Sequence, residues 1–137
     1  MPTLSHSPPF ALLEKARNTA TILLLLFCPV LNAAELLYVF EPQCGACRAF
    51  DRDIGSIYPK TEEASIAPLR PLNFSEIHGN IIVLEDQQVQ LKAAIVGTPT
   101  FILISDGHEV DRFSGYSRDE LFWMSLQRLL NRLPRPQ

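Results

Sequence analysis

Positive charge is not in excess in this chain, whose 137 residues include 12 lysines and arginines against 15 aspartates and glutamates. The formal net charge of −3 gives no support for binding to nucleic acid, which needs a basic surface. The chain also lacks internal repeats and low-complexity stretches. Its length suggests a single folded domain, so we expect one domain and no nucleic-acid partner.

Cysteine and histidine are scarce as well. The chain has only three cysteines, too few for a scaffold that is held together by several disulfides. A structural zinc site needs about four ligands, and His78 and His108, the histidines outside the N-terminal region, are far apart in the sequence. A covalent haem site needs a histidine directly after Cys47, where this chain has Arg48. We therefore expect no metal and no cofactor.

A long hydrophobic run is missing too, because the apolar stretch near the N-terminus covers only 20–31. A bilayer-spanning helix takes about 20 residues. Basic residues precede this run and small residues follow it, as in a secretory signal peptide. We predict a signal peptide over 1–34, a folded domain over 35–137, and export to the periplasm. The alternative is an uncleaved signal that anchors the chain in the membrane, because Asn32 stands near the cleavage site where a small residue is preferred.

What the chain does contain is a cysteine pair, Cys44-Gly45-Ala46-Cys47, directly after the apolar run 36–40. An unbroken apolar run is typical of a strand that is buried on both faces. If a helix begins at Cys44, its N-terminus lowers the pKa of that thiol, and the thiolate is the form that attacks disulfides. Cys47, one helical turn later, can resolve the mixed disulfide. The pair indicates thiol–disulfide exchange, with Cys44 as nucleophile and Cys47 as resolving thiol.

The middle of the chain predicts alternating helices and strands. We expect a helix over 44–57, one helical turn over 61–64, and a strand over 66–73. That strand contains two prolines, so it should be irregular or lie toward an edge of the sheet. A second helix is expected over 84–95, with these inner positions: Val89, Leu91, Ala94 and Ile95.

The C-terminal part predicts a hairpin that is closed by a helix. Strands over 100–104 and 109–113 flank Asp106-Gly107, which is a hairpin turn signal. Ser117 and Glu120 match a capping box that opens a final helix through about residue 130. The order strand–helix–strand–helix–strand–strand–helix begins with a parallel crossover. It predicts an α/β fold with a central mixed four-stranded sheet flanked by helices.

A second chemical motif, Gly97-Thr98-Pro99, directly precedes the strand over 100–104. In a protein that exchanges disulfides, a cis Pro99 facing the cysteines would turn the backbone of Thr98 outward. The N–H and C=O groups of Thr98 could then pair with an extended segment of a client protein. The alternative is an ordinary trans proline at the start of a strand, since most X-Pro bonds are trans.

Together these motifs resemble the thioredoxin superfamily, and the likeness covers the chain from residue 35 onward. It rests on the cysteine pair at a strand–helix junction, Gly-Thr-Pro-Thr-Phe, the Asp-Gly hairpin, Phe-Ser-Gly-Tyr and the closing helix. A closer similarity is to the SoxS-type periplasmic thioredoxins of bacterial sulfur-oxidation (Sox) clusters, around 58–63, 67–70, 98–101, 115–116 and 122–123. The resemblance implies a thioredoxin-like fold and an enzyme that keeps a sulfur-oxidation carrier subunit in usable form.

The chain departs from ordinary thioredoxins at the site. The tryptophan before the first cysteine and the proline between the cysteines are replaced by Gln43 and Ala46. The buried aspartate that accepts the proton of the second cysteine is replaced by Tyr38. Glu41, three residues before Cys44, is a candidate for this proton relay, and an exposed turn residue is the alternative. A carboxylate here would also raise a thiol pKa and so oppose the helix dipole.

The direction of electron flow is predicted less directly. The Gly-Ala dipeptide lacks the histidine that stabilises the reduced form of oxidant-type pairs, which favours a reductase. An exported reductase needs electrons from a membrane thiol carrier. The alternatives are a disulfide oxidase or isomerase, a thioredoxin of cytochrome c maturation, and a redox-responsive regulator or chaperone without turnover. Nothing in the sequence favours an oligomer, so we expect a monomer.

Overall fold

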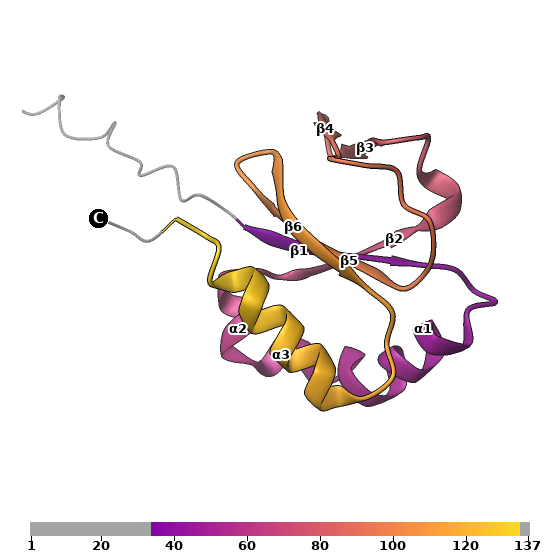
Figure 1. The fold of residues 1–137 in the computed structure, drawn as a ribbon, viewed down its shortest axis with the longest axis vertical. Coiled ribbons are helices and arrows are strands. Elements are labelled where there is room, and N and C mark those ends of the chain that lie inside the picture. The colour runs from indigo at the N-terminus through magenta and orange to yellow at the C-terminus, as the bar shows by residue number, and fades with distance from the viewer. Residues whose placement is uncertain (1–33, 135–137) are drawn as a thin grey trace, which may run out of the picture. The chain divides into compact units, whose positions relative to one another are not determined.

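The computed structural model describes residues 34–134, in which a four-stranded mixed sheet has helices on one face and a β-hairpin on the other (Figure 1). β1 pairs in parallel with β2 and antiparallel with β5, and β5 pairs antiparallel with β6. In sheet order, the strands are β2 (Leu69–Asn73), β1 (Glu35–Phe40), β5 (Thr100–Ser105) and β6 (His108–Ser114). The predicted signal peptide, apart from its last residue, lies outside the described residues.

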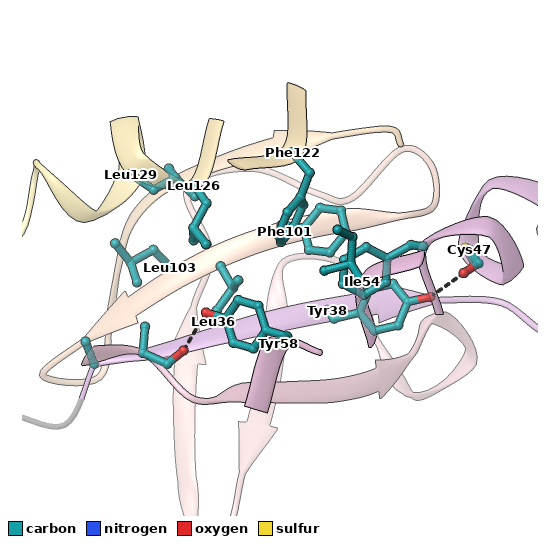
Figure 2. Close-up of a cluster of buried hydrophobic side chains, with 13 residues drawn as sticks. Leu36, Tyr38, Cys47, Ile54, Tyr58, Phe101, Leu103, Phe122, Leu126 and Leu129 are labelled. Atoms are coloured by element: carbon teal, nitrogen blue, oxygen red, sulfur yellow. Dashed lines mark hydrogen bonds between the residues drawn. The ribbon is translucent and has the colours of Figure 1, made fainter. Parts of the chain in front are cut away.

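Both faces of the central strands are buried, because successive side chains of a strand point to opposite sides. On β1, Leu36 and Tyr38 face the helices, whereas Leu37 and Val39 belong to the core on the other face. Every residue of β5 is buried. The helix-side core is built around these buried side chains (Figure 2): Leu36, Tyr38, Phe50, Ile54, Tyr58, Phe101, Leu103, Phe122, Leu126 and Leu129.

The first helical region covers one end of this core. The predicted helix over 44–57 is observed as α1 (Gly45–Phe50), which continues into a π-helical turn, Asp51–Gly55. A 3-10 turn, Tyr58–Lys60, and the short helix α2 (Glu62–Ile66) follow. The Oγ1 of Thr61 accepts the backbone N–H of Ala64 at 3.3 Å and so caps α2.

The closing helix is α3 (Asp119–Leu130), but its predicted capping box is wrong. Arg118, not Ser117, occupies the N-cap, and its side chain makes no capping hydrogen bond. Asp119 and Glu120 stand in the first turn instead, where negative charge interacts favourably with the helix dipole. None of the helices within 34–134 has the length and apolar character that crossing a bilayer demands.

The helix predicted over 84–95 is also wrong. The chain there forms a hairpin of β3 (Ile81–Leu84) and β4 (Gln87–Gln90), in which Ile82 pairs with Val89. Burial alternates along β3, which is the period of a strand. The turn residue Glu85 has a φ of 55°, a left-handed conformation that a helix does not contain.

The hairpin, rather than the predicted helix, covers the second face of the sheet. Val89, Leu91 and Ile95 are buried as predicted, but they reach the core from a strand and a loop, whereas Ala94 is exposed. The spacing of these apolar residues also fits a helix over a few turns. The helix prediction therefore overlooked the alternation of apolar and polar residues in the two strands on either side of the turn. The sheet residues that they cover are Leu37, Val39, Ile102 and Ile104.

Two other local predictions are confirmed. β2, which contains Pro71 and directly follows Pro68, lies at the edge of the sheet, where a missing N–H donor is tolerated. Asp106 and Gly107 form the turn between β5 and β6, and both have positive φ, as a two-residue hairpin turn of this kind requires.

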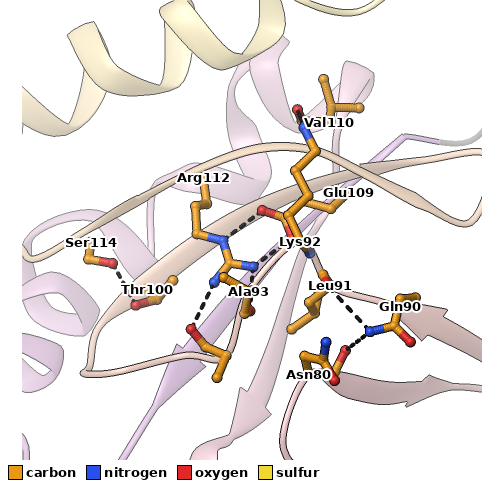
Figure 3. Close-up of polar contacts among 11 residues, drawn as sticks. Asn80, Gln90, Leu91, Lys92, Ala93, Thr100, Glu109, Val110, Arg112 and Ser114 are labelled. Atoms are coloured by element: carbon orange, nitrogen blue, oxygen red, sulfur yellow. Dashed lines mark hydrogen bonds and ion pairs between the residues drawn. The ribbon is translucent and has the colours of Figure 1, made fainter.

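A buried ion pair holds the segment that follows β4 (Figure 3). The Glu109 carboxylate, 2% exposed, accepts two N–H groups of Arg112 at 2.6 Å and the backbone N–H of Lys92 at 2.8 Å. Arg112 also donates to the carbonyl of Ala93 at 2.9 Å. Burial opposes ionisation of Glu109, but the bonds from Arg112 and Lys92 outweigh it and lower the pKa of the carboxyl. The network fixes the chain that leads toward Thr98.

Candidate active site

Cys44 and Cys47 lie where β1 ends and α1 begins, and they are joined in a disulfide. Cys44 is the N-cap residue of α1, and its Sγ accepts the backbone N–H of Cys47 at 3.0 Å. In the reduced protein, the same N–H would stabilise a Cys44 thiolate. Cys44 is partly exposed, whereas Cys47 is only 1% exposed. A client disulfide can therefore reach the first sulfur but not the second.

Thr98 and Pro99 lie beside Cys44, although Thr98 is 54 residues away in the sequence. The Thr98–Pro99 peptide bond is cis, which confirms that prediction. The carbonyl oxygen of Thr98 is 3.4 Å from Cys44 Sγ. Pro99 is buried, and its carbonyl accepts the backbone N–H of Gly115 at 2.7 Å. The cis-proline loop is thus anchored on the side of β6.

Glu41 joins the cysteine turn to the cis-proline loop. Its Oε2 accepts a hydrogen bond from Thr98 Oγ1 at 3.0 Å, and its backbone carbonyl accepts the N–H of Cys44 at 3.1 Å. The structure therefore brings all five residues predicted for the site together. Within residues 34–134, histidines, cysteines and acidic residues form no group of three or more that could hold a metal ion.

Tyr38 faces the backbone of the buried cysteine (Figure 2). Its hydroxyl donates to the carbonyl of Cys47 at 3.2 Å, and its ring packs against Phe50 and Phe101 with centroid distances of 4.6 and 5.4 Å. Burial, reinforced by the carboxylate of Asp51, raises the pKa of Tyr38 well above its ordinary value. The phenol therefore stays protonated and acts as a hydrogen-bond donor rather than as a base.

A groove opens beside Cys44, and the sequence reasoning missed one of its walls. That wall is the segment 73–75, where Asn73 ends β2 and its Oδ1 accepts the backbone N–H of Ser75 at 3.0 Å. Because β2 runs parallel to β1, both strands end at the same edge of the sheet. The predicted parallel crossover already implied that the end of the second strand lies beside the cysteines. The groove is lined by Glu41, Pro42, Gln43, Cys44, Asn73, Phe74, Ser75 and Thr98.

Comparison with known proteins identifies the family. Residues 31–130 match the family model of the thioredoxin-like domain. The chain belongs to the thioredoxin-like family. The comparison with curated protein sequences found no match to this chain.

Solved structures agree with this assignment. The periplasmic thioredoxin SoxS from Paracoccus pantotrophus, in its reduced form, is 29% identical with a TM-score of 0.64, over 72% of this chain and 97% of that one. A thioredoxin-fold protein from Helicobacter pylori is 18% identical with a TM-score of 0.51, over 73% of this chain and 70% of that one. This second similarity is one of fold alone. The predicted fold class and the predicted SoxS-type resemblance are confirmed.

The cysteine geometry gives this thioredoxin-like protein its chemistry. A partly exposed sulfur at the start of a helix, with a second sulfur one turn behind it, is the arrangement that dithiol–disulfide exchange requires. The protein is a thiol–disulfide oxidoreductase.

Proposed function

We propose that this thioredoxin-like protein is a periplasmic reductase of protein disulfides. One observation carries the proposal: the partly exposed Cys44 Sγ lies 3.4 Å from the backbone carbonyl of Thr98, with the buried Cys47 behind it. A client strand that pairs with the backbone of Thr98 would hold its own disulfide next to Cys44. Thr98 and Pro99 are therefore the client-binding residues of the proposal.

The reaction transfers two electrons from the protein to the client. The Cys44 thiolate attacks one client sulfur, so that a Cys44–client disulfide forms while the client S–S bond breaks and the departing sulfur takes up a proton. Cys47 then loses its proton and attacks Cys44 Sγ, which releases the second client thiol. The Cys44–Cys47 disulfide remains, and a dithiol donor must reduce it before the next cycle.

Glu41 is the candidate to accept the proton that Cys47 loses. Its side chain bonds to Thr98, the residue whose carbonyl lies next to Cys44 Sγ. Tyr38 does not suit this step, because its phenol already holds a proton and its pKa is raised. Replacing Glu41 by glutamine removes the base but keeps an oxygen acceptor, so a relay predicts a lower kcat and an altered pH profile for Glu41→Gln.

The sequence and the SoxS likeness support a proposal for the client and for the compartment. The signal-like N-terminus supports export, and the solved SoxS neighbour is a periplasmic thioredoxin. We propose a sulfur-oxidation carrier subunit with a thiol as the client, and a membrane thiol–disulfide carrier as the electron donor.

The reduction potential of the Cys44–Cys47 pair tests the direction. Equilibration against defined thiol buffers should give a value near or below about −230 mV, within the range of thioredoxins and glutaredoxins. A value near about −120 mV is that of an oxidant and would contradict a reductase.

Trapping tests the order of the two cysteines. Cys47→Ser should form a covalent adduct with insulin, used as a model protein disulfide, because the mixed disulfide at Cys44 can no longer be resolved. Cys44→Ser is the matched control and should form none. Adduct formation by Cys44→Ser alone would reverse the assigned roles, and wild-type protein that does not turn over insulin would favour a regulator.

A further inference from the structure

One side-chain hydrogen bond crosses the active site between segments that are 57 residues apart in the sequence, from Thr98 Oγ1 to Glu41 Oε2 at 3.0 Å. We propose that this bond, the Glu41–Thr98 clamp, holds the cis-proline loop against the turn before Cys44 and thereby sets the affinity for protein clients. In the clamp, Glu41 is a positioning residue that acts through Thr98, and this role is separate from the proton transfer proposed above. The inference rests on the proposed function, because it concerns how that site receives its client.

The Glu41 end of the clamp is firmly held. Glu41 directly follows β1, and its backbone carbonyl accepts the N–H of Cys44 at 3.1 Å. The carbonyl of the next residue, Pro42, accepts a hydrogen bond from Arg48 Nη1 at 3.2 Å. The Glu41 carboxylate therefore projects from a turn that is bonded both to the cysteine and to α1.

The Thr98 end lies in a loop whose backbone carbonyls on either side of Thr98 are bonded to β5 and to Gly115. After Thr98, the carbonyl of Pro99 is bonded to Gly115 at 2.7 Å. Before Thr98, the carbonyl of Gly97 accepts a hydrogen bond from Thr100 Oγ1 at 2.7 Å, at the start of β5, and the Val96 side chain is 96% exposed. Neither of these two backbone bonds reaches the cysteine turn. The Thr98 side chain is thus well placed to fix the loop against the cysteine turn.

Client binding needs a fixed distance between the Thr98 backbone and Cys44 Sγ. A client strand must pair with the backbone of Thr98 while its disulfide reaches Cys44 Sγ, which lies 3.4 Å from the Thr98 carbonyl. A loop that moves relative to Cys44 has to be ordered when the client binds, and that ordering weakens affinity. Losing the clamp should therefore act mainly on KM for a protein client. A small disulfide has no backbone to pair with Thr98 and depends less on the loop.

The test measures kcat and KM of the full chain with insulin and with hydroxyethyl disulfide. Glu41→Ala and Thr98→Val should each raise KM for insulin about fivefold, the worth of one net hydrogen bond, with a smaller loss for hydroxyethyl disulfide. Glu41→Gln and Thr98→Ser keep an acceptor and a donor, so they should recover most of that loss. The double variant should be no worse than the more affected single variant, because both remove the same bond.

Glu76→Ala is the matched control, since Glu76 is an exposed carboxylate next to Ser75 of the groove. Its KM should stay that of the wild type, and a rise equal to that of Glu41→Ala would mean that charge, not the clamp, matters. Additive rises in KM in the double variant, or equal rises in KM with both substrates, would overturn the clamp. Wild-type protein that reduces neither substrate would overturn the proposed function with it, whereas an active wild type with unaffected variants would overturn the clamp alone.

Discussion

Replacing Glu109 by glutamine should destabilise the protein severely, because it breaks a buried ion pair and leaves its partner in place. The side chains of Glu109 and Arg112 are 2% and 20% exposed. Removing one member of a buried pair costs about 3–5 kcal/mol. Glutamine keeps one oxygen acceptor and Arg112 reaches some solvent, so we expect a loss of about 2–3 kcal/mol in the free energy of unfolding.

Urea denaturation and thermal unfolding measure this loss. For a domain of about 100 residues, each kcal/mol shifts Tm by about 4–8 °C, so Glu109→Gln should lower Tm by about 8–24 °C. The loss should also depend on pH. The folded-state pKa of Glu109 lies below its ordinary value of 4.5, so its contribution is present above that value and disappears as pH falls through the folded pKa. The difference between wild type and variant should therefore shrink in acid.

Asp111→Asn supplies the control on the same strand. Asp111 pairs with Arg132 at 3.2 Å, but their side chains are 26% and 58% exposed. Such a pair contributes about 0–1 kcal/mol. If Glu109→Gln were no more destabilising than Asp111→Asn, or if its effect were the same at acid and neutral pH, the account of a buried and ionised Glu109 would be refuted.

Two further predictions concern the core and alkaline pH. Leu126→Ala should cost about 2–5 kcal/mol in urea denaturation because Leu126 is fully buried, whereas Leu121→Ala, at a position 44% exposed on the same helix, should cost far less; equal losses would contradict the packing described for α3. All three tyrosines have raised pKa values, chiefly through burial, and that of Tyr116 is raised to about 12. Since the ordinary value is 10.0, stability is complete below that pH and should fall as the pH rises above it. Tyrosinate absorbance should therefore show no tyrosine of the folded chain ionising near its ordinary pKa, and one that does would contradict the burial of these rings.

Much of the fold could be predicted from local pattern. The unbroken apolar run at 36–40 predicted a strand buried on both faces, because burial on both sides removes any need for alternation, and 100–104 predicted a second strand. Pro68 and Pro71 predicted an edge strand, and Asp106-Gly107 predicted a hairpin, from backbone chemistry alone. In each case the deciding property belongs to residues that are neighbours in the sequence.

The hairpin of β3 and β4 could not be predicted in this way. Val89, Leu91 and Ile95 fit both a helix and a strand followed by a loop, so the local pattern did not discriminate. The contacts that decide between them come from the sheet, whose second face must be covered by apolar side chains at positions that the hairpin reaches. A short segment with an ambiguous period takes its structure from the surface against which it packs.

The active site, too, has a part that local sequence predicts and a part that depends on tertiary contacts. The spacing of Cys44 and Cys47 after a strand was enough to indicate disulfide exchange, because both residues belong to one turn of helix. The sequence motif also singled out Thr98 and Glu41, but not the hydrogen bond between them, and it did not reveal the wall at 73–75. Those contacts join segments far apart in the chain, and they exist only once the sheet has brought the ends of β1 and β2 and the start of β5 to one edge. By itself, then, the sequence determined the reactive sulfurs, whereas the tertiary structure decided what surrounds them.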